Sequence, residues 1–155
     1  MKAAAKTRNE ARWRGAGREW ATPPELFSEL DSEFRFNLDP CATDRSAKCR
    51  RFFTESDDGL SQNWGKSRVF LNPPYGREIP AWIAKARESA EAGALVVGLL
   101  PASTDSAWWH EHVIGHAEVR YLRKRPRFLV YLQHETKWAS PFQPCVVVIW
   151  RPHWE

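Results

Sequence analysis

Residues 67–100 read SRVFLNPPYGREIPAWIAKARESAEAGALVVGLL, and this stretch decides the fold class. A short apolar strand pattern over 67–71 ends at two consecutive prolines, which cannot donate backbone hydrogen bonds. A helical apolar pattern follows over 79–91, and residues 94–100 form a continuous apolar run that is typical of a strand buried on both faces. This strand–helix–strand order predicts a parallel βαβ unit with a right-handed crossover, and hence an α/β fold.

The residues upstream extend this pattern. Apolar residues recur at helical spacing over 23–34, where Thr22 is a candidate N-cap and the two prolines after it fit the first helical turn. Short strands are predicted at 36–39 and 51–54.

The residues downstream add one helix and several strands. Ser103–Thr104–Asp105 can cap a helix that runs to about Ile114. Three further strands are predicted at 118–122, 128–132 and 145–150. We therefore expect one doubly wound mixed sheet with helices on both faces and a partly antiparallel edge.

Length and charge limit the classes of protein that remain. The chain has 155 residues, which is typical of one domain, and its 43% apolar and 27% charged residues exclude a disordered or collagen-like chain. The formal charge of +4 resides entirely in residues 1–19, which we expect to be a flexible basic arm or an arm that binds nucleic acid. Residues 20–155 would form a single domain.

Other features predict a soluble intracellular protein. No apolar stretch approaches the roughly 20 residues that span a bilayer, and the first residues lack the apolar core of a signal peptide. The three cysteines match no zinc spacing, so we expect reduced thiols. His112 and His116 lie four residues apart, but no carboxylate or cysteine motif accompanies them, and we expect no metal site.

The Asn72-Pro73-Pro74-Tyr75 motif carries the strongest chemical signal. It follows a predicted buried strand, and open α/β sheets bind ligands at the carboxyl ends of their strands. Because the prolines lack N–H groups, the motif offers carbonyl oxygens, an amide and an aromatic ring, which suit a nucleobase with an exocyclic amino group. A plain turn, or a proline-rich ligand for another domain, is the structural alternative.

The ordered set of motifs over about residues 20–150 resembles the phage-type DNA N6-adenine methyltransferases, which are small enzymes dependent on S-adenosylmethionine. The matching segments are Trp20–Pro23, Phe36–Ala42, Asp57–Leu60 with Trp64, Phe70–Gly76, Trp82 with Lys85–Ala86, Leu99–Thr104 with Trp108–Trp109, Arg127–Phe128, and Ser140–Phe142.

The resemblance implies a catalytic role for Asn72, Pro73, Pro74 and Tyr75. The side-chain oxygen of Asn72 and the carbonyl of Pro73 would accept the two amino hydrogens of a flipped adenine, and the ring of Tyr75 would stack on that base. Methyl transfer would then be an in-line displacement that depends mainly on positioning.

The resemblance also implies a cofactor site for S-adenosylmethionine, made of Trp20, Thr22, Pro23, Asp39, Pro40, Cys41, Ala42, Asp58 and Asn72. The glycine-rich turn of the wider superfamily is missing, because Ala42 and Thr43 stand in its place. Asp58 could instead be a solvated turn residue. The short interval between Asp39 and Asn72 predicts a shortened class I (Rossmann-like) methyltransferase sheet.

Candidate DNA contacts are basic or aromatic. They are Arg77, Trp108, Trp109, Arg120, Arg123, Lys124, Arg125 and Arg127; the position of the cluster at 120–127 between two predicted strands favours phosphate contacts, and a solvated face is the alternative. Because neighbouring residues point to different sides of a helix, we expect only one of the two tryptophans in the core.

Together these features predict a site-specific adenine-N6 methyltransferase that acts on double-stranded DNA. The enzyme would be a monomer or homodimer without a separate target-recognition domain, encoded by a phage or prophage and active in the cytoplasm of a bacterial host. RNA or protein-glutamine methylation through the same Asn72–Tyr75 pocket remains the alternative activity, and a non-catalytic DNA-binding relative the alternative from another class.

Overall fold

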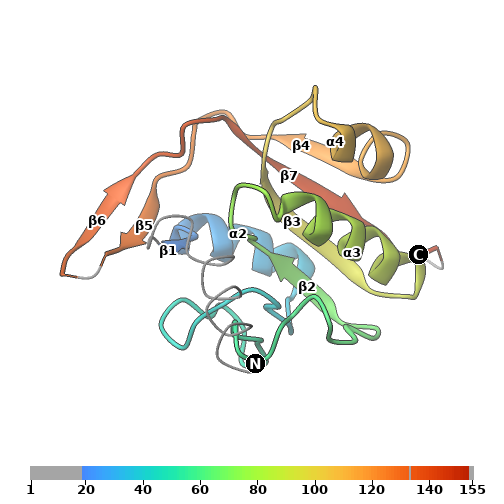
Figure 1. Cartoon of the computed structure of the whole chain (residues 1–155), viewed down its shortest axis with the longest axis horizontal. Coiled ribbons are helices and arrows are strands. Elements are labelled where there is room, and N and C mark those ends of the chain that lie inside the picture. The colour runs from blue at the N-terminus through green and yellow to red at the C-terminus, as the bar shows by residue number, and fades with distance from the viewer. Residues whose placement is uncertain (1–18, 133, 154–155) are drawn as a thin grey trace, which may run out of the picture.

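The computed structural model describes residues 19–132 and 134–153 as a mixed α/β structure with two sheets (Figure 1). The predicted basic arm therefore lies outside the described residues, except for Glu19, which begins a strand. The helices are α2 (Pro24–Phe34), α3 (Ile79–Glu91) and α4 (Ala107–His112). The strands are β1 (Glu19–Ala21), β2 (Arg68–Leu71), β3 (Leu95–Pro101), β4 (Glu118–Tyr121), β5 (Phe128–Tyr131), β6 (Thr136–Ala139) and β7 (Cys145–Trp150).

The larger sheet has the order β2–β3–β7–β4. Strands β2 and β3 are parallel, with Val69 opposite Val96, and α3 connects them as the predicted βαβ unit requires. Strand β7 runs antiparallel to both β3 and β4, so the expected mixed sheet with an antiparallel edge is confirmed.

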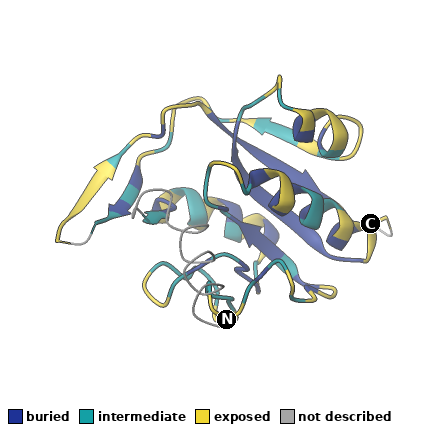
Figure 2. Ribbon diagram, in the orientation of Figure 1, coloured by how far each residue is buried: buried dark blue, intermediate teal, exposed yellow. Residues whose placement is uncertain are grey.

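Helices cover both faces of this sheet. The side chains of its strands alternate between two hydrophobic cores, one on each face. Val96 and Leu100 of β3 pack in one cluster with α3 and α4, whereas Val97 and Leu99 pack in the other with α2. Every residue of β3 and β7 is buried, as Figure 2 shows by the dark blue of the central strands. The continuous apolar run therefore forms a central strand, as the sequence predicts.

Two of the predicted short strands are reduced to isolated bridges, one to β2 and one between the two segments themselves. Leu38 pairs with Val69 and Asp39 pairs with Phe52, both in parallel. These two bridges extend the larger sheet beyond β2. They place Asp39 near the end of β2, where Asn72 begins the proline motif.

A second sheet corrects the expectation of a single one. Strand β5 does not join the larger sheet; it pairs antiparallel with β1 and with β6. The sequence prediction missed β1 and β6, whose short segments lack alternating apolar residues. The β5–β6 hairpin projects from one end of the molecule (Figure 1), and β6 is mostly exposed (Figure 2).

Helix ends also differ from the expectation. Pro23, not Thr22, is the N-cap of α2, and its cap involves no side-chain hydrogen bond. The third helix is shorter than predicted, because it begins after Ser106 rather than at the Ser103–Asp105 turn. Within the described residues, no helix is long and apolar enough to cross a membrane.

Candidate active site

A cavity of about 890 Å³ lies where the two sheets meet. Its volume falls in the range of about 300–1,000 Å³ that is usual for small-molecule sites. The walls come from β1, the loop after Asp39, the end of β2, and the small sheet with the segment that follows it. The lining residues are Glu19, Trp20, Ala21, Thr22, Asp39, Cys41, Ala42, Thr43, Arg45, Ser46, Lys48, Glu55, Phe70, Asn72, Pro73, Pro74, Tyr75, Gly76, Phe128, Tyr131, Leu132, Pro141, Phe142 and Gln143.

The side chain of Asn72 has a defined orientation in this cavity. Its Nδ2 donates a hydrogen bond to the carbonyl oxygen of Trp20 at 3.0 Å. Since a carbonyl oxygen only accepts hydrogen bonds, the amide must present its NH2 group to Trp20. The side-chain oxygen of Asn72 is thereby left as the acceptor at the end of β2, next to the buried Pro73, which has no N–H group.

Tyr75 lines the cavity and is anchored by its hydroxyl. The hydroxyl donates to the carbonyl oxygen of Leu99 at 3.1 Å, and the ring meets Phe128 edge-on at 6.4 Å between centroids. Burial, with a smaller effect of Cys145, raises the pKa of Tyr75 well above its usual value. The phenol therefore stays neutral, and its ring is an aromatic wall rather than a base.

Asp39 organises the loop that forms the opposite wall. It is only 3% exposed, and its two carboxyl oxygens accept hydrogen bonds from the backbone N–H groups of Cys41 and Lys48 at 3.3 and 3.0 Å. Burial raises the pKa of Asp39 to about 6, although these two hydrogen bonds oppose the shift. The carboxyl group of Asp39 thus closes this loop, and Asp39 is also one of the residues that line the cavity.

The same loop is tied to the small sheet. The hydroxyl of Thr43 donates to Glu19, and the guanidinium of Arg45 lies 3.5 Å from Glu19 and 3.8 Å above the ring centre of Tyr131. These contacts join β1, β5 and the loop around one side of the cavity. No local sequence pattern predicts these contacts, since Glu19 and Tyr131 become neighbours only through the β1–β5 pairing.

One residue at the cavity has a buried hydroxyl without a partner among the described residues. Thr22 is 2% exposed and lines the cavity, yet its Oγ1 has no hydrogen-bond partner among the described residues. Such an atom normally costs free energy unless another group satisfies it. The cavity therefore fits a ligand with polar groups, and Thr22, Asp39 and the Trp20 segment are suited to hold one.

The cavity brings together only part of the predicted site. Trp20, Thr22, Asp39, Cys41, Ala42 and the Asn72–Tyr75 motif all line it. Pro23, Pro40 and Asp58 are not among the lining residues. Asp58 has a left-handed backbone with φ of 52°, and its carbonyl oxygen accepts two hydrogen bonds from Ser61, as a turn residue would. Glu55, Arg45 and Lys48 also line the cavity, and no sequence motif predicts them there.

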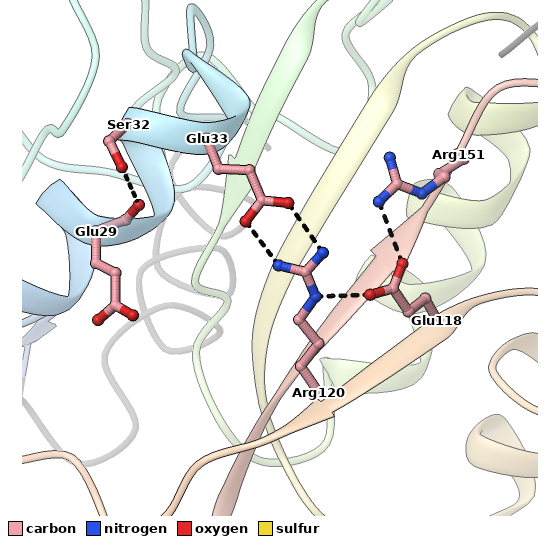
Figure 3. Close-up of polar contacts among 6 residues, drawn as sticks. All are labelled: Glu29, Ser32, Glu33, Glu118, Arg120 and Arg151. Atoms are coloured by element: carbon pink, nitrogen blue, oxygen red, sulfur yellow. Dashed lines mark hydrogen bonds and ion pairs between the residues drawn. The ribbon is translucent and has the colours of Figure 1, made fainter.

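Arg120 lies in an ion-pair network rather than at a free basic surface (Figure 3). Its guanidinium makes two hydrogen bonds to Glu33 of α2, at 2.7 and 2.9 Å, and one to Glu118. Glu118 also accepts a hydrogen bond from Arg151. These hydrogen bonds lower the pKa of Glu33 and of Glu118. The network connects α2, β4 and the residues after β7.

The other predicted DNA contacts have different surroundings. Arg77, Arg123, Lys124, Arg125 and Arg127 are exposed, and Arg125 also donates to the carbonyl oxygens of Pro141 and Phe142. Trp108 and Trp109 are both buried, at 8% and 5% exposure, which corrects the expectation that only one would be in the core. Their rings meet edge-on, and both pack in the cluster with α3.

A sequence profile of the DNA N-6-adenine-methyltransferase (Dam) family matches residues 11–155, which is nearly the whole chain. The chain belongs to this family. The DNA N-6-adenine-methyltransferase of Escherichia phage T1 is 32% identical over 105 residues, which cover 66% of this chain and 44% of that protein. The protein of the same name from Haemophilus phage HP1 is 29% identical over 105 residues, covering 66% of this chain and 61% of that protein.

The chain thus spans about half the length of these curated Dam relatives. The family membership agrees with the resemblance found in the motifs. The cavity is therefore interpreted as part of a methyltransferase.

Proposed function

We propose that this chain transfers a methyl group from S-adenosylmethionine to the N6 amino group of adenine in double-stranded DNA. The mixed sheet with helices on both faces would be a shortened class I methyltransferase sheet. The observation that carries the proposal is the oriented amide of Asn72, since the Trp20 carbonyl holds its NH2 group and leaves an acceptor beside Pro73.

The proposed chemistry follows from these acceptors. The side-chain oxygen of Asn72 and the carbonyl oxygen of Pro73 accept the two hydrogens of the adenine amino group. Two such hydrogen bonds fix the direction of the nitrogen lone pair, so the chain contributes mainly orientation. The amino group loses its proton after transfer, when it has become acidic, and a strong base is not required.

Tyr75 would bind the flipped base by stacking. Its anchored hydroxyl fixes the position of the ring and the edge-on contact with Phe128 restricts the ring plane, so little side-chain entropy remains to be lost when the base arrives. Base–aromatic stacking is worth about 1–3 kcal/mol, which offsets part of the few kcal/mol that base flipping costs.

The residues suited to hold S-adenosylmethionine lie on the other walls. When bound, it supplies an electrophilic methyl group on a positively charged sulfur. The carboxyl group of Asp39 would face the ammonium of its methionine part, and Thr22 Oγ1 would gain the hydrogen-bond partner that it lacks. Trp20, Cys41 and Ala42 would enclose it, while Pro23, Pro40 and Asp58 would support the surrounding loops from outside the cavity.

The substrate class can be tested directly. The purified chain is incubated with S-adenosylmethionine labelled on the methyl group and with unmethylated DNA, RNA or protein extract in parallel. We expect label in double-stranded DNA, recovered as N6-methyladenine. Label in RNA or protein alone would contradict the proposal and favour the corresponding methylation, and calorimetry that shows no S-adenosylmethionine binding would favour a non-catalytic DNA-binding relative. Because the DNA of a phage or its host lies in the bacterial cytoplasm, we expect the protein to act there, as a monomer or homodimer.

A further inference from the structure

Phe142 combines full exposure with a place at the cavity. Its side chain is 98% exposed, more than any other large apolar side chain in the described part of the chain, yet it lines the cavity together with Gln143. Water-exposed phenylalanine is unfavourable by itself. An aromatic ring at the mouth of a ligand cavity therefore indicates a surface that something else covers.

The backbone around this ring is held in place. The guanidinium of Arg125 donates to the carbonyl oxygen of Phe142 at 3.0 Å, and the side chain of Gln143 accepts a hydrogen bond from Ser103 at 3.0 Å. The N–H of Ala102 donates to the carbonyl oxygen of Pro144 at 2.8 Å. Prolines at 141 and 144 further restrict the segment. Phe142 is thus presented on a fixed support, which lowers the entropy lost when the ring inserts between other groups.

The charge around Phe142 indicates a polyanion. Residues 121–144 contain five lysines and arginines and a single acidic residue, Glu135. Arg123, Lys124, Arg127 and Lys137 of this segment are all exposed. Phosphate groups of a nucleic acid are the natural partners of such a segment, since lysine and arginine contacts to phosphate supply most sequence-independent affinity.

We propose that Phe142 enters the base stack of duplex DNA and fills the space that the target adenine leaves. This inference rests on the proposed function, because it needs a flipped base in the adjacent cavity. Apolar side chains inserted between base steps are a known way to stabilise unstacked DNA. A ring at the mouth of the cavity that holds Asn72 and Tyr75 is in the right place for it, and the cations of residues 121–144 would hold the flanking phosphates.

The test compares two duplexes of identical sequence. The site is first mapped by sequencing N6-methyladenine in DNA treated with the unaltered chain. Methylation rates are then measured on a fully paired duplex and on one in which the target adenine faces an abasic position, where flipping breaks no base pair. For Phe142→Ala we expect about a tenfold loss on the paired duplex and less than about a threefold loss on the abasic one. Phe142→Leu, which keeps an apolar side chain, should retain most of the rate.

Ile114→Ala is the matched control, because Ile114 is an apolar residue that is 53% exposed, lies outside residues 121–144 and does not line the cavity. It should methylate both duplexes at the unaltered rate, and neither alanine variant should change the melting temperature. Equal rates for Phe142→Ala and the unaltered chain on the paired duplex would overturn the inference, and so would equal losses on both duplexes. If the unaltered chain methylates no DNA, the proposed function itself fails, which is a different outcome.

Discussion

The carbonyl oxygen of Trp20 accepts a hydrogen bond from Asn72 Nδ2 at 3.0 Å, across 52 positions of sequence. The backbone of one sheet thereby orients a side chain at the edge of the other, because Trp20 belongs to β1 and Asn72 follows β2. This relationship determines which end of the Asn72 amide is available to a substrate.

Replacing Asn72 by alanine should abolish methyl transfer with little effect on the fold. We expect an activity loss of about 100-fold or more, since a positioned hydrogen-bonding group is removed. Loss of the bond to Trp20 should cost about 1 kcal/mol, or a melting temperature lower by about 2–4 °C. Asn63→Ala is the control, because Asn63 is exposed and its side-chain oxygen accepts a local bond from the N–H of Gly65. An unfolded Asn72→Ala variant would show that Asn72 is mainly structural.

Asp39 should make stability depend on pH in an identifiable direction. Its folded-state pKa of about 6 exceeds the ordinary value of 3.8, so its contribution to stability is full below about pH 4 and is lost as the pH rises through 6. This rise in the pKa of Asp39 corresponds to roughly 3 kcal/mol. The measurement is urea unfolding of the unaltered chain and of Asp39→Asn at pH 4, 5, 6 and 7. The contribution of Asp39 is the change with pH in the difference between their free energies of unfolding.

Asparagine cannot accept the hydrogen bonds from Lys48 and Cys41 as a carboxylate does, so Asp39→Asn also changes the free energy of unfolding by an amount that does not depend on pH. Only the part of the difference between the two proteins that changes with pH therefore reports on the pKa of Asp39. The pKa values of Glu33 and Glu118 are lowered, and these residues lose their stabilising effect as the pH falls, but they contribute equally to both proteins. A difference that stays constant over this range would contradict the raised pKa of Asp39.

Replacing Arg120 and replacing Arg127 should have different effects, although both residues lie in the basic cluster at 120–127. Because Arg120 is engaged by Glu33 and Glu118, Arg120→Ala should lower the melting temperature by about 1–3 °C and leave the salt dependence of DNA binding unchanged. Arg127 is exposed, so Arg127→Ala should weaken DNA binding and reduce the slope of log K against log salt by about 1. If Arg120→Ala instead reduced the salt dependence of DNA binding and Arg127→Ala did not, Arg120 would have to leave its ion-pair network to contact DNA.

Gly59 should not tolerate a side chain. A Cβ atom there would lie 2.0 Å from the carbonyl oxygen of Pro40 and 3.2 Å from the ring of Trp82. We expect Gly59→Ala to cost about 3 kcal/mol or more, because backbone must move in the loop after Asp39. Gly65→Ala is the comparison, since its φ is +57° but no atom lies within 4 Å, and it should cost only about 1 kcal/mol. Chemical denaturation of both variants decides whether the close approach or the backbone angle is the stronger constraint.

The sequence predicted the features that depend on local patterns. The bounds of α3 agree with the expected 79–91, and β3 follows from the apolar run, because long periodic or continuous apolar segments leave few alternatives. The motif after β2 was also identified, since consecutive prolines have an unambiguous effect on the backbone. Its place in the cavity agrees with the expected site, whereas its catalytic role stays a prediction.

Features that depend on distant pairs were not predictable in this way. Strand β1 has only three residues and owes its existence to Leu129, Val130 and Tyr131 more than a hundred positions later. The sequence predicts Arg120 as a DNA contact, because nothing near it in the sequence reveals that Glu33 lies opposite. The exposure of Phe142 is equally invisible, since apolar residues are more often buried than exposed.

The cavity wall runs from Glu19 to Gln143, so its two ends are nearly as far apart in the chain as the described residues allow. The βαβ unit of β2, α3 and β3 can form from neighbouring residues, but the pairing of β1 with β5 closes a long loop, which is slow in folding. The acceptor geometry of Asn72 should therefore arise late in folding, after most of the secondary structure is present. A refolding chain would recover its circular dichroism before it recovers its ability to act on a substrate.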